Sequence, residues 1–133
     1  MLMLYCGLRA TDFHSINEIF HTSMREANSV CKDSTGFVWI ASRFGILRLT
    51  DDDCHHYQLP DNYAAATTKL ASRNGLLLAY CNNGLIFRYN MIADRFELLM
   101  DMHKLLNRYT IIVNRLTIDT HNGLWIATAG GLY

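Results

Sequence analysis

One short pattern recurs along the chain, and it limits the fold more than any other feature of the sequence. Asp33 is followed six residues later by Trp39, and Trp39 is followed six residues later by Gly45. A second copy with the same spacing consists of Asp119, Trp125 and Gly131. Copies of one motif at long intervals indicate structural units that stack against one another.

A weaker third copy lies between these two. Ser72 takes the place of Asp, Leu78 takes the place of Trp and Gly84 takes the place of the final Gly. The Trp positions of the three copies, 39, 78 and 125, are therefore 39 and 47 residues apart. A period of about 40 to 50 residues with a Gly/Trp signature and short strands is typical of the blades of a β-propeller.

Each copy begins with the residues of a tight turn. An Asp side chain can accept hydrogen bonds from backbone N–H groups inside a turn, and Gly adopts the positive φ that many turns need. We expect such turns after Asp33 and Asp119, with Gly36 in the first turn and Gly75 in the weaker copy. The strand expected at residues 38–42 is apolar on both faces, which predicts a sheet covered on both sides by neighbouring blades.

These features predict an all-β fold, an incomplete β-propeller that spans residues 13–133. We expect about two and a half to three four-stranded blades, at about residues 29–59, 66–99 and 111–133. Because each blade of a propeller buries its faces against the next blade, we expect the chain to be a fragment of a longer propeller and to be marginally stable alone.

Three local variations are expected within this scheme. Residues 16–20 have the pattern of a short strand. The middle copy has one residue more than the first copy between its Gly and the following Arg, at Gly84 and Arg88, which predicts a bulge that turns later side chains to the opposite face. Apolar residues at helical spacing predict a short helix between the second and third blades. They are Leu99, Met102, Leu105, Leu106 and Tyr109.

Residues 1–12 precede the repeats as a separate N-terminal segment. Its apolar run is about eight residues long, has no basic lead-in and is not followed by a small-residue cleavage site. The segment is therefore not a convincing signal peptide, and the alternatives are an ordinary N-terminal strand, the remnant of a signal sequence and the remnant of a shortened gene model. No apolar run in the sequence approaches the roughly 18 residues of a membrane-spanning helix, so we expect no membrane contact by this chain.

The charge of the chain is balanced, with 12 Lys and Arg residues against 12 Asp and Glu residues. No basic stripe is present that could neutralise phosphate groups, so nucleic-acid binding is not expected. The four cysteines lack the spacing of a metal finger, and the sequence does not assign disulfides among them. They are Cys6, Cys31, Cys54 and Cys81, of which Cys31 and Cys81 fit buried apolar positions of strands.

Neither a metal site nor a catalytic site is expected. Cys54, His55 and His56 form a metal-like cluster, but adjacent strand residues point to opposite faces and no further ligand has a suitable spacing. Asp33 and Asp119 could form a pair of catalytic carboxylates, yet each lies in an equivalent turn of a separate blade, where capping explains it. The sequence has no Ser-His-Asp order, phosphate loop or Gly-x-Ser-x-Gly elbow, and no cofactor is expected.

The two tryptophans have two interpretations. Either ring could stack on a sugar, as aromatic side chains in carbohydrate sites do. However, Trp39 and Trp125 recur at one position of each strong copy, and core packing must recur in each blade whereas a ligand site need not. We therefore assign both rings to the packing between blades.

The best candidates for ligand binding lie in the turns between the second and third strands of the blades, at one rim of the propeller. The variable residues there are Arg43, Phe44, Asn82 and Asn83. Arg43 could pair with a uronic acid or sulfate, Phe44 could stack on a sugar ring, and the two Asn side chains could bind hydroxyl groups. The alternative is structural: Phe44 fills a joint between blades and the Asn pair shapes its turn.

The first copy resembles the repeat of the two-component regulator propeller family, which reads roughly D-x-x-G-x-[IL]-W-[IV]-[GA]-T-x-x-G-L-x-R. The matching residues in the first copy are Asp33, Gly36, Trp39, Ile40, Ala41, Gly45 and Arg48. Those in the final copy are Asp119, Leu124, Trp125, Ile126, Ala127, Thr128, Gly131 and Leu132. The middle copy keeps only Gly75, Gly84, Leu85 and the aliphatic pattern.

Members of this family form the periplasmic sensor of hybrid two-component systems, ahead of a membrane span, a histidine kinase and often a response regulator. The resemblance implies a non-enzymatic sensor fragment in the periplasm that responds to glycan-derived ligands such as oligosaccharides and has the rest of the sensor as its partner. Kinase activity is implied only for a longer parent protein. The alternative is a stand-alone propeller-like module for protein interaction, which completes its ring as a homo-oligomer. A propeller enzyme is disfavoured because no acid and base residues converge.

Overall fold

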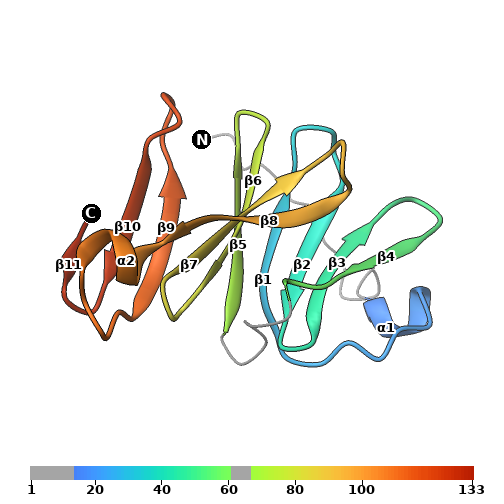
Figure 1. The fold of residues 1–133 in the computed structure, drawn as a ribbon. Helices are drawn as coiled ribbons and strands as arrows, with labels where there is room; N and C mark the ends of the chain where they lie inside the picture. Colours follow the sequence, from blue (N-terminus) through green and yellow to red (C-terminus); the bar gives the residue numbers. More distant parts are fainter. Residues whose placement is uncertain (1–13, 61–66) are drawn as a thin grey trace, which may run out of the picture.

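The strands of the chain form three antiparallel sheets that stand side by side (Figure 1). A computed structural model describes residues 14–60 and 67–133. The first sheet has the strand order β1-β2-β3-β4, the second has the order β5-β6-β7-β8, and the third has the order β11-β10-β9. The predicted all-β fold is confirmed.

Each sheet is built from short strands that are consecutive in the sequence. The first sheet contains β1 (Ala27–Lys32), β2 (Val38–Ser42), β3 (Gly45–Leu49) and β4 (Cys54–Tyr57). The second sheet contains β5 (Thr68–Arg73), β6 (Leu76–Cys81), β7 (Leu85–Asn90) and β8 (Arg95–Asp101). The third sheet contains β9 (Val113–Ile118), β10 (Leu124–Thr128) and β11 (Gly131–Leu132).

Corresponding hairpins turn at the same edge of the sheets. In Figure 1 the β1–β2, β5–β6 and β9–β10 turns lie at the upper edge, and the β2–β3 and β6–β7 turns lie at the opposite edge. The repeated motif therefore places its Asp or Ser residue at one rim and its final Gly at the other.

Two apolar cores lie between the sheets. The first core, between the first and second sheets, includes Trp39, Ile46, Tyr57, Leu77, Phe87 and Phe96. The second core, between the second and third sheets, includes Leu78, Ile86, Met102, Val113, Leu116 and Ile126. Leu77 and Leu78 are adjacent in β6 and belong to different cores, so the middle sheet is covered on both faces. Each large apolar side chain buried in this way contributes about 1.5–3 kcal/mol to folding.

The Trp position of each copy faces the next sheet along the chain. Trp39 in β2 packs against Tyr89 and Phe96 of the second sheet, with ring centroids 4.8 and 5.9 Å away. Leu78, at the same position of β6, packs into the core shared with the third sheet. Trp125 has this position in β10, beyond which the described residues form no further sheet, and 50% of its surface is exposed. Trp125 thus departs from the expected packing between blades.

The segment at residues 16–20 contains a helix, and the prediction of a strand there is wrong. Helix α1 spans Ile16–Ile19. The side-chain oxygen of Asn17 accepts hydrogen bonds from the Thr22 hydroxyl and the Met24 N–H at 2.7 and 2.9 Å, which closes the chain back on this helix. The apolar residues 16, 19 and 20 also fit the i, i+3, i+4 spacing of a helix, so the pattern of a segment this short is compatible with either element.

The extra residue of the middle copy lies in its turn, and the predicted bulge after Gly84 is wrong. The β6–β7 turn is one residue longer than the β2–β3 turn and absorbs the insertion. Arg88 therefore lies opposite Leu78 in the ladder, just as Arg48 lies opposite Trp39. A register shift is found instead where β7 pairs with β8.

The helix predicted between the second and third sheets is confirmed. Helix α2 spans Met102–Leu106, and Met102 is buried in the second core. The Asp101 carboxylate accepts a hydrogen bond from the His103 N–H at 3.0 Å and caps the first turn. Asn107 follows the helix in the left-handed conformation, with a φ of 50°.

A polar seam joins the first and second sheets beside the first core, and it consists of Arg48, Tyr57, Tyr89 and Asp94. The hydroxyls of Tyr57 and Tyr89 donate hydrogen bonds to one carboxylate oxygen of Asp94 at 2.8 and 2.6 Å. The Arg48 guanidinium donates to the Tyr89 hydroxyl at 3.1 Å and lies 3.7 Å from the same carboxylate oxygen. The two tyrosine hydrogen bonds hold the pKa of the Asp94 carboxyl below its ordinary value.

Three of the four cysteines have a place in the described residues. Cys31, Cys54 and Cys81 are free thiols. Cys81 is fully buried in the first core, and burial together with the nearby Asp33 carboxylate raises the pKa of the half-buried Cys31 to about 11. The predicted N-terminal segment, residues 1–12 with Cys6, lies outside the described residues. In the part that is described, no helix is both long and apolar enough to cross a membrane.

Candidate functional site

The turn between β2 and β3 shapes the candidate site. The Ser42 hydroxyl accepts a hydrogen bond from the Phe44 N–H at 3.2 Å and donates one to the Gly45 carbonyl at 3.0 Å. Bonds of this kind between a side chain and the nearby backbone fix the shape of a turn. Phe44 is thereby held at the rim of the sheet, with 63% of its surface exposed.

Gly45 allows β4 to pass close to this turn. Its φ of 138° lies in the region that favours glycine. A Cβ atom at this position would lie 2.8 Å from the Tyr57 carbonyl oxygen, so the hairpin and β4 fit together only because residue 45 has no side chain. Gln58 then donates from its side-chain amide to the Phe44 carbonyl at 2.9 Å. The backbone of Phe44 is thus held from two sides.

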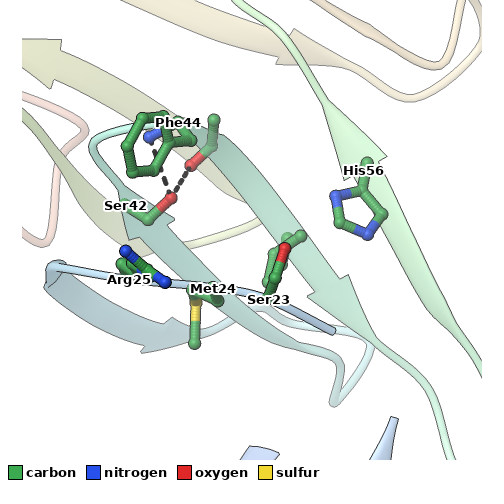
Figure 2. A pocket seen from close by; sticks show the side chains of 8 residues that line it. Ser23, Met24, Arg25, Ser42, Phe44 and His56 are labelled. Atoms are coloured by element: carbon green, nitrogen blue, oxygen red, sulfur yellow. Dashed lines mark hydrogen bonds between the residues drawn. The ribbon is translucent and has the colours of Figure 1, made fainter. Parts of the chain in front are cut away.

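A hollow of about 390 Å³ opens beside the Phe44 ring (Figure 2). Its walls come from the connection between α1 and β1, from the β2–β3 hairpin and from β4. The residues that line this rim hollow are Ser23, Met24, Arg25, Ser42, Phe44, Gly45, Leu47 and His56. The volume and the mixture of apolar and polar walls suit a small ligand.

The polar side chains of the rim hollow are available to a ligand. Arg25 brings a full positive charge, His56 brings an imidazole, and none of the described residues in the wall is an Asp or Glu. Within the described part of the chain, the side chains of Ser23, Arg25 and His56 make no hydrogen bond or ion pair. Phe44 offers a flat apolar face beside them, so the hollow can combine ring stacking with hydrogen bonding.

Arg43 flanks the Phe44 ring but does not line the rim hollow. Its guanidinium carbon lies 5.9 Å from the centroid of the Phe44 ring. The same guanidinium lies 3.5 Å from a carboxylate oxygen of Glu26. With 67% of the Arg43 side chain exposed, this ion pair adds little to stability.

Asn82 and Asn83 lie in the β6–β7 turn, outside the rim hollow. The Asn82 side-chain oxygen accepts a hydrogen bond from the Thr67 N–H at 3.1 Å, and the Asn82 carbonyl accepts one from the Val113 N–H at 2.8 Å. The Asn83 carbonyl lies 2.6 Å from a ring nitrogen of His103. This turn therefore joins β5, β9 and α2, and ligand binding by the Asn pair stays a prediction.

In the first sheet the repeated motif is organised around one carboxylate. Asp33 accepts hydrogen bonds from the N–H groups of Thr35 and Phe37 at 2.9 and 3.0 Å, and from the Trp39 indole N–H at 2.6 Å. Burial alone would raise the pKa of Asp33, but a hydrogen bond from the Thr35 hydroxyl together with these three outweighs it and lowers the pKa below its ordinary value. The indole bond gives a physical reason for the six-residue interval between Asp and Trp, which turn capping does not explain.

The third sheet has the same arrangement. Asp119 accepts hydrogen bonds from the N–H groups of His121 and Gly123, both at 2.8 Å, and from the Trp125 indole N–H at 2.9 Å. The indole bond is the largest of the effects that lower the Asp119 pKa. Asn122 is the third residue after Asp119, as Gly36 is the third residue after Asp33, and it adopts a positive φ of 63°.

The middle copy has a different turn because it lacks the Asp. Asn74 and Gly75 alone connect β5 to β6, both with positive φ, as in the two-residue turns of tight hairpins. Gly84 lies against α2, where an added Cβ atom would be 3.3 Å from the Met102 side chain. Gly131 is the first residue of β11.

Cys54, His55 and His56 do not converge on one point. The His55 ring lies 3.4 Å from the Asp53 carboxylate, and His56 lines the rim hollow. Over residues 14–60 and 67–133, no group of three or more His, Cys, Asp and Glu residues could hold a metal ion.

Among the residues that line the rim hollow, only Phe44 was expected at a ligand site, and the lining residues from outside the β2–β3 hairpin are Ser23, Met24, Arg25 and His56. The first three belong to the connection after α1, which has no recurring pattern. His56 lies opposite Leu47 in the β3–β4 ladder, so strand pairing was the one sequence-level signal that could have placed it beside the turn.

Comparison with known proteins identifies the fold. No protein-family model and no curated protein matches the chain. The extracellular domain of a protein described as a one-component system from B. thetaiotaomicron matches with a TM-score of 0.62 and 23% identity, over 89% of this chain and 17% of that one. The extracellular domain of a protein described as a hybrid two-component system from the same organism matches with a TM-score of 0.59 and 14% identity, over 79% and 16%. Virginiamycin B lyase from Staphylococcus aureus matches with a TM-score of 0.58 and 16% identity, over 80% and 40%.

These similarities confirm the predicted propeller-type fold. The chain spans at most 40% of the length of each of these three structures. Because the set includes an enzyme as well as extracellular domains of signalling proteins, the fold alone does not decide between a sensor and a catalyst.

Proposed function

We propose that the chain is a non-enzymatic, ligand-binding part of a sensor-type propeller that works outside the cytoplasm, in the periplasm. Two observations support this proposal. Its fold resembles the extracellular domains of two proteins described as signalling systems. It also has a hollow at the β2–β3 turn, where the repeat pattern specifies no particular residue type.

The ligand class proposed for the rim hollow is a glycan-derived oligosaccharide. The observation that carries this proposal is the exposed Phe44 ring beside open polar donors. A sugar ring has an apolar face of C–H groups, which can stack on Phe44, and hydroxyls at its edge, which can bind Arg25, His56 and Ser23. Arg43, whose guanidinium carbon lies 5.9 Å from the centroid of the Phe44 ring, would pair with an acidic substituent of the next sugar.

The composition of the rim hollow supports binding without catalysis. Glycan-cleaving enzymes use a pair of carboxylates as acid and base or nucleophile, and the described residues that line the hollow include no carboxylate. The Ser42 hydroxyl is occupied by two backbone groups of its own turn. In a longer parent protein, a bound ligand would act by shifting the arrangement of domains and thereby the activity of a kinase.

The experiment is a titration of neutral and acidic oligosaccharides into the chain by calorimetry. We expect Phe44→Ala to weaken binding about tenfold or more, because the stacking surface is lost. Arg43→Ala should weaken only the acidic ligands. The matched control is Tyr109→Ala, which removes a fully exposed aromatic ring outside the rim hollow. Unchanged affinity in Phe44→Ala would remove the rim hollow as the site.

The exposed face of the third sheet favours a second candidate, an interaction module. Trp125 and Leu132 are 50% and 65% exposed. In each of the first two sheets, the residues at the two corresponding positions are buried against a neighbouring sheet. The partner would be the rest of a sensor chain or, for a stand-alone module, another copy. Light scattering at increasing concentration tests the second arrangement: a homo-oligomer that Trp125→Glu dissociates would support it, and a monomer at all concentrations would contradict it.

A further inference from the structure

A second groove runs along the first strands of the three sheets. It has a volume of about 450 Å³ and is lined mainly by residues of β1, β5 and β9. In a propeller, the blades surround a central channel. We call this feature the axial groove, and it shares no lining residue with the rim hollow.

Among the described residues that line the axial groove, three have positive side chains and none has a carboxylate. Lys69 and Arg73 lie four residues apart on β5 and therefore on one face of the strand, and Arg115 belongs to β9. None of the three forms an ion pair with a described residue. The chain as a whole has as many acidic as basic residues, so this positive charge is a local excess.

One carboxylate lies near the end of the axial groove, but it does not neutralise the excess. Asp119 is close enough to Arg73 for the positive charge to lower its pKa, although this effect is smaller than that of its hydrogen bonds. The Asp119 oxygens accept hydrogen bonds from its own hairpin, including the Trp125 indole N–H. Its geometry is therefore set by the hairpin, and the Arg73 guanidinium keeps open donors.

Hydrogen bonds fix the positions of two of the cations. The Lys69 ammonium donates to the Asn114 carbonyl at 3.1 Å, and the Arg73 guanidinium donates to the Ile118 carbonyl at 3.3 Å. Asn114 and Ile118 are four residues apart in β9, so the Lys69 and Arg73 charges are roughly 14 Å apart, and Arg115 lies between these two residues along the strand. At physiological salt the Debye length is about 8 Å, so only cations closer together than this repel one another appreciably through solvent. A bound anion would relieve this repulsion.

Neutral hydrogen-bonding groups complete the wall. Asn28, Ser72, Asn114 and Thr117 line the axial groove, and their side chains make no hydrogen bond within the described part of the chain. Amide and hydroxyl groups next to unpaired cations suit a ligand that carries both charged oxygens and hydroxyls.

We propose that the axial groove binds an anionic ligand, whose carboxylate, sulfate or phosphate oxygens are held by Lys69, Arg73 and Arg115. The same chemistry can come from an acidic sugar or from an inorganic oxyanion, and the experiment separates these sources. The inference does not rest on the proposed function, because the axial groove and the rim hollow have no residue in common.

The test is a titration of the complete 133-residue chain with trigalacturonate, inorganic sulfate and inorganic phosphate, each at 50 and 200 mM NaCl. Maltotriose, a neutral trisaccharide, is the control ligand. We expect at least one of the anions to bind, with an affinity that falls at the higher salt concentration because the contact is electrostatic. Tight binding of trigalacturonate alone would assign an acidic sugar, and equal binding of sulfate or phosphate would assign a simple oxyanion. Failure of all three anions to bind at millimolar concentration would overturn the proposal.

The variant Arg115→Gln locates the site. Arg115 is exposed and forms no hydrogen bond or ion pair in the described structure, so its loss should leave the circular dichroism spectrum and the unfolding midpoint unchanged. We expect about tenfold weaker anion binding, and a larger loss when Lys69→Gln is added. The matched control is Arg88→Gln, which removes an exposed cation outside the axial groove. Equal weakening in Arg88→Gln, or no weakening in Arg115→Gln, would refute the assignment. Phe44→Ala should not change the anion affinity, which keeps this test separate from that of the rim hollow.

Discussion

The first and third sheets carry the same Asp–Trp hairpin in two different surroundings. In both, one carboxylate holds its turn and also accepts the indole N–H, at 2.6 Å from Asp33 to Trp39 and at 2.9 Å from Asp119 to Trp125. Trp39 is fully buried, whereas Trp125 is half exposed. The hairpin therefore forms by contacts within seven residues, and its burial depends on what lies opposite.

What lies opposite Trp39 is an aromatic cluster. Tyr57 of its own sheet and Tyr89 and Phe96 of the second sheet lie with ring centroids 4.8 to 5.9 Å from Trp39. Aromatic pairs at such distances add about 0.5–1.5 kcal/mol each beyond the area they bury. The comparison shows that the motif has two roles, a local one in the turn and a tertiary one between sheets, and that substitutions can separate them.

The largest effect is expected for Trp39→Ala. The substitution leaves a cavity between the first and second sheets and should lower the free energy of unfolding by about 3–5 kcal/mol. Urea denaturation followed by far-UV circular dichroism measures this change. A loss below about 1 kcal/mol would show that the interface between these sheets contributes little to stability.

Asp33→Ala should have the next largest effect. It leaves the buried Trp39 indole N–H without its acceptor and removes the hydrogen bonds of the turn, which should cost about 2–3 kcal/mol. The matched variant is Asp119→Ala, whose carboxylate lies in a solvated hairpin, and it should cost clearly less. Equal losses in the two variants would contradict the view that burial decides the strength of this bond.

Trp125→Ala should destabilise the chain only slightly, by about 1 kcal/mol, because the exposed half of the ring is already in water. The measurement is the same denaturation experiment. Intrinsic fluorescence adds a check, since Trp125 should be quenched by acrylamide in the native chain and Trp39 should be protected. Protection of both rings in solution would mean that a further surface covers the third sheet.

The smallest effect is a dependence of stability on pH. The folded pKa of Asp33 is lowered, so its stabilising contribution is present above the unfolded pKa of about 4 and is lost as the pH falls through the folded value. The free energy of unfolding should therefore decrease between pH 5 and pH 2, and less steeply in Asp33→Asn. Parallel pH profiles for the wild-type chain and this variant would exclude Asp33 as a source of the acid sensitivity.

Much of the architecture followed from local chemistry. Asp, Trp and Gly at fixed intervals marked the hairpins, and apolar residues at helical spacing marked α2. The short segment of α1 was misassigned because four residues are too few to separate helical from strand periodicity. The insertion near Gly84 was misassigned because a turn can absorb an extra residue at less cost than a ladder, which would lose hydrogen bonds and side-chain register.

The candidate site was predictable only in part. Phe44 stood out because it lies in a turn where the repeat allows variation, and the structure places it at the rim hollow. Arg25 and His56 could not be connected to it, because they come from segments that meet only after the sheet has formed. The axial groove was missed for the same reason, since Lys69 and Arg115 belong to different sheets and the net charge of the chain is zero.

The sequence by itself determined the repeating hairpins, because a turn held by Asp and Gly and a strand with alternating faces depend on residues that are neighbours along the chain. The tertiary structure alone decided which of the two equivalent tryptophans is buried, and which polar residues share a hollow or a groove. Burial and shared electrostatic environment arise from surfaces that are distant in sequence, and no local pattern encodes which surface comes to lie opposite another.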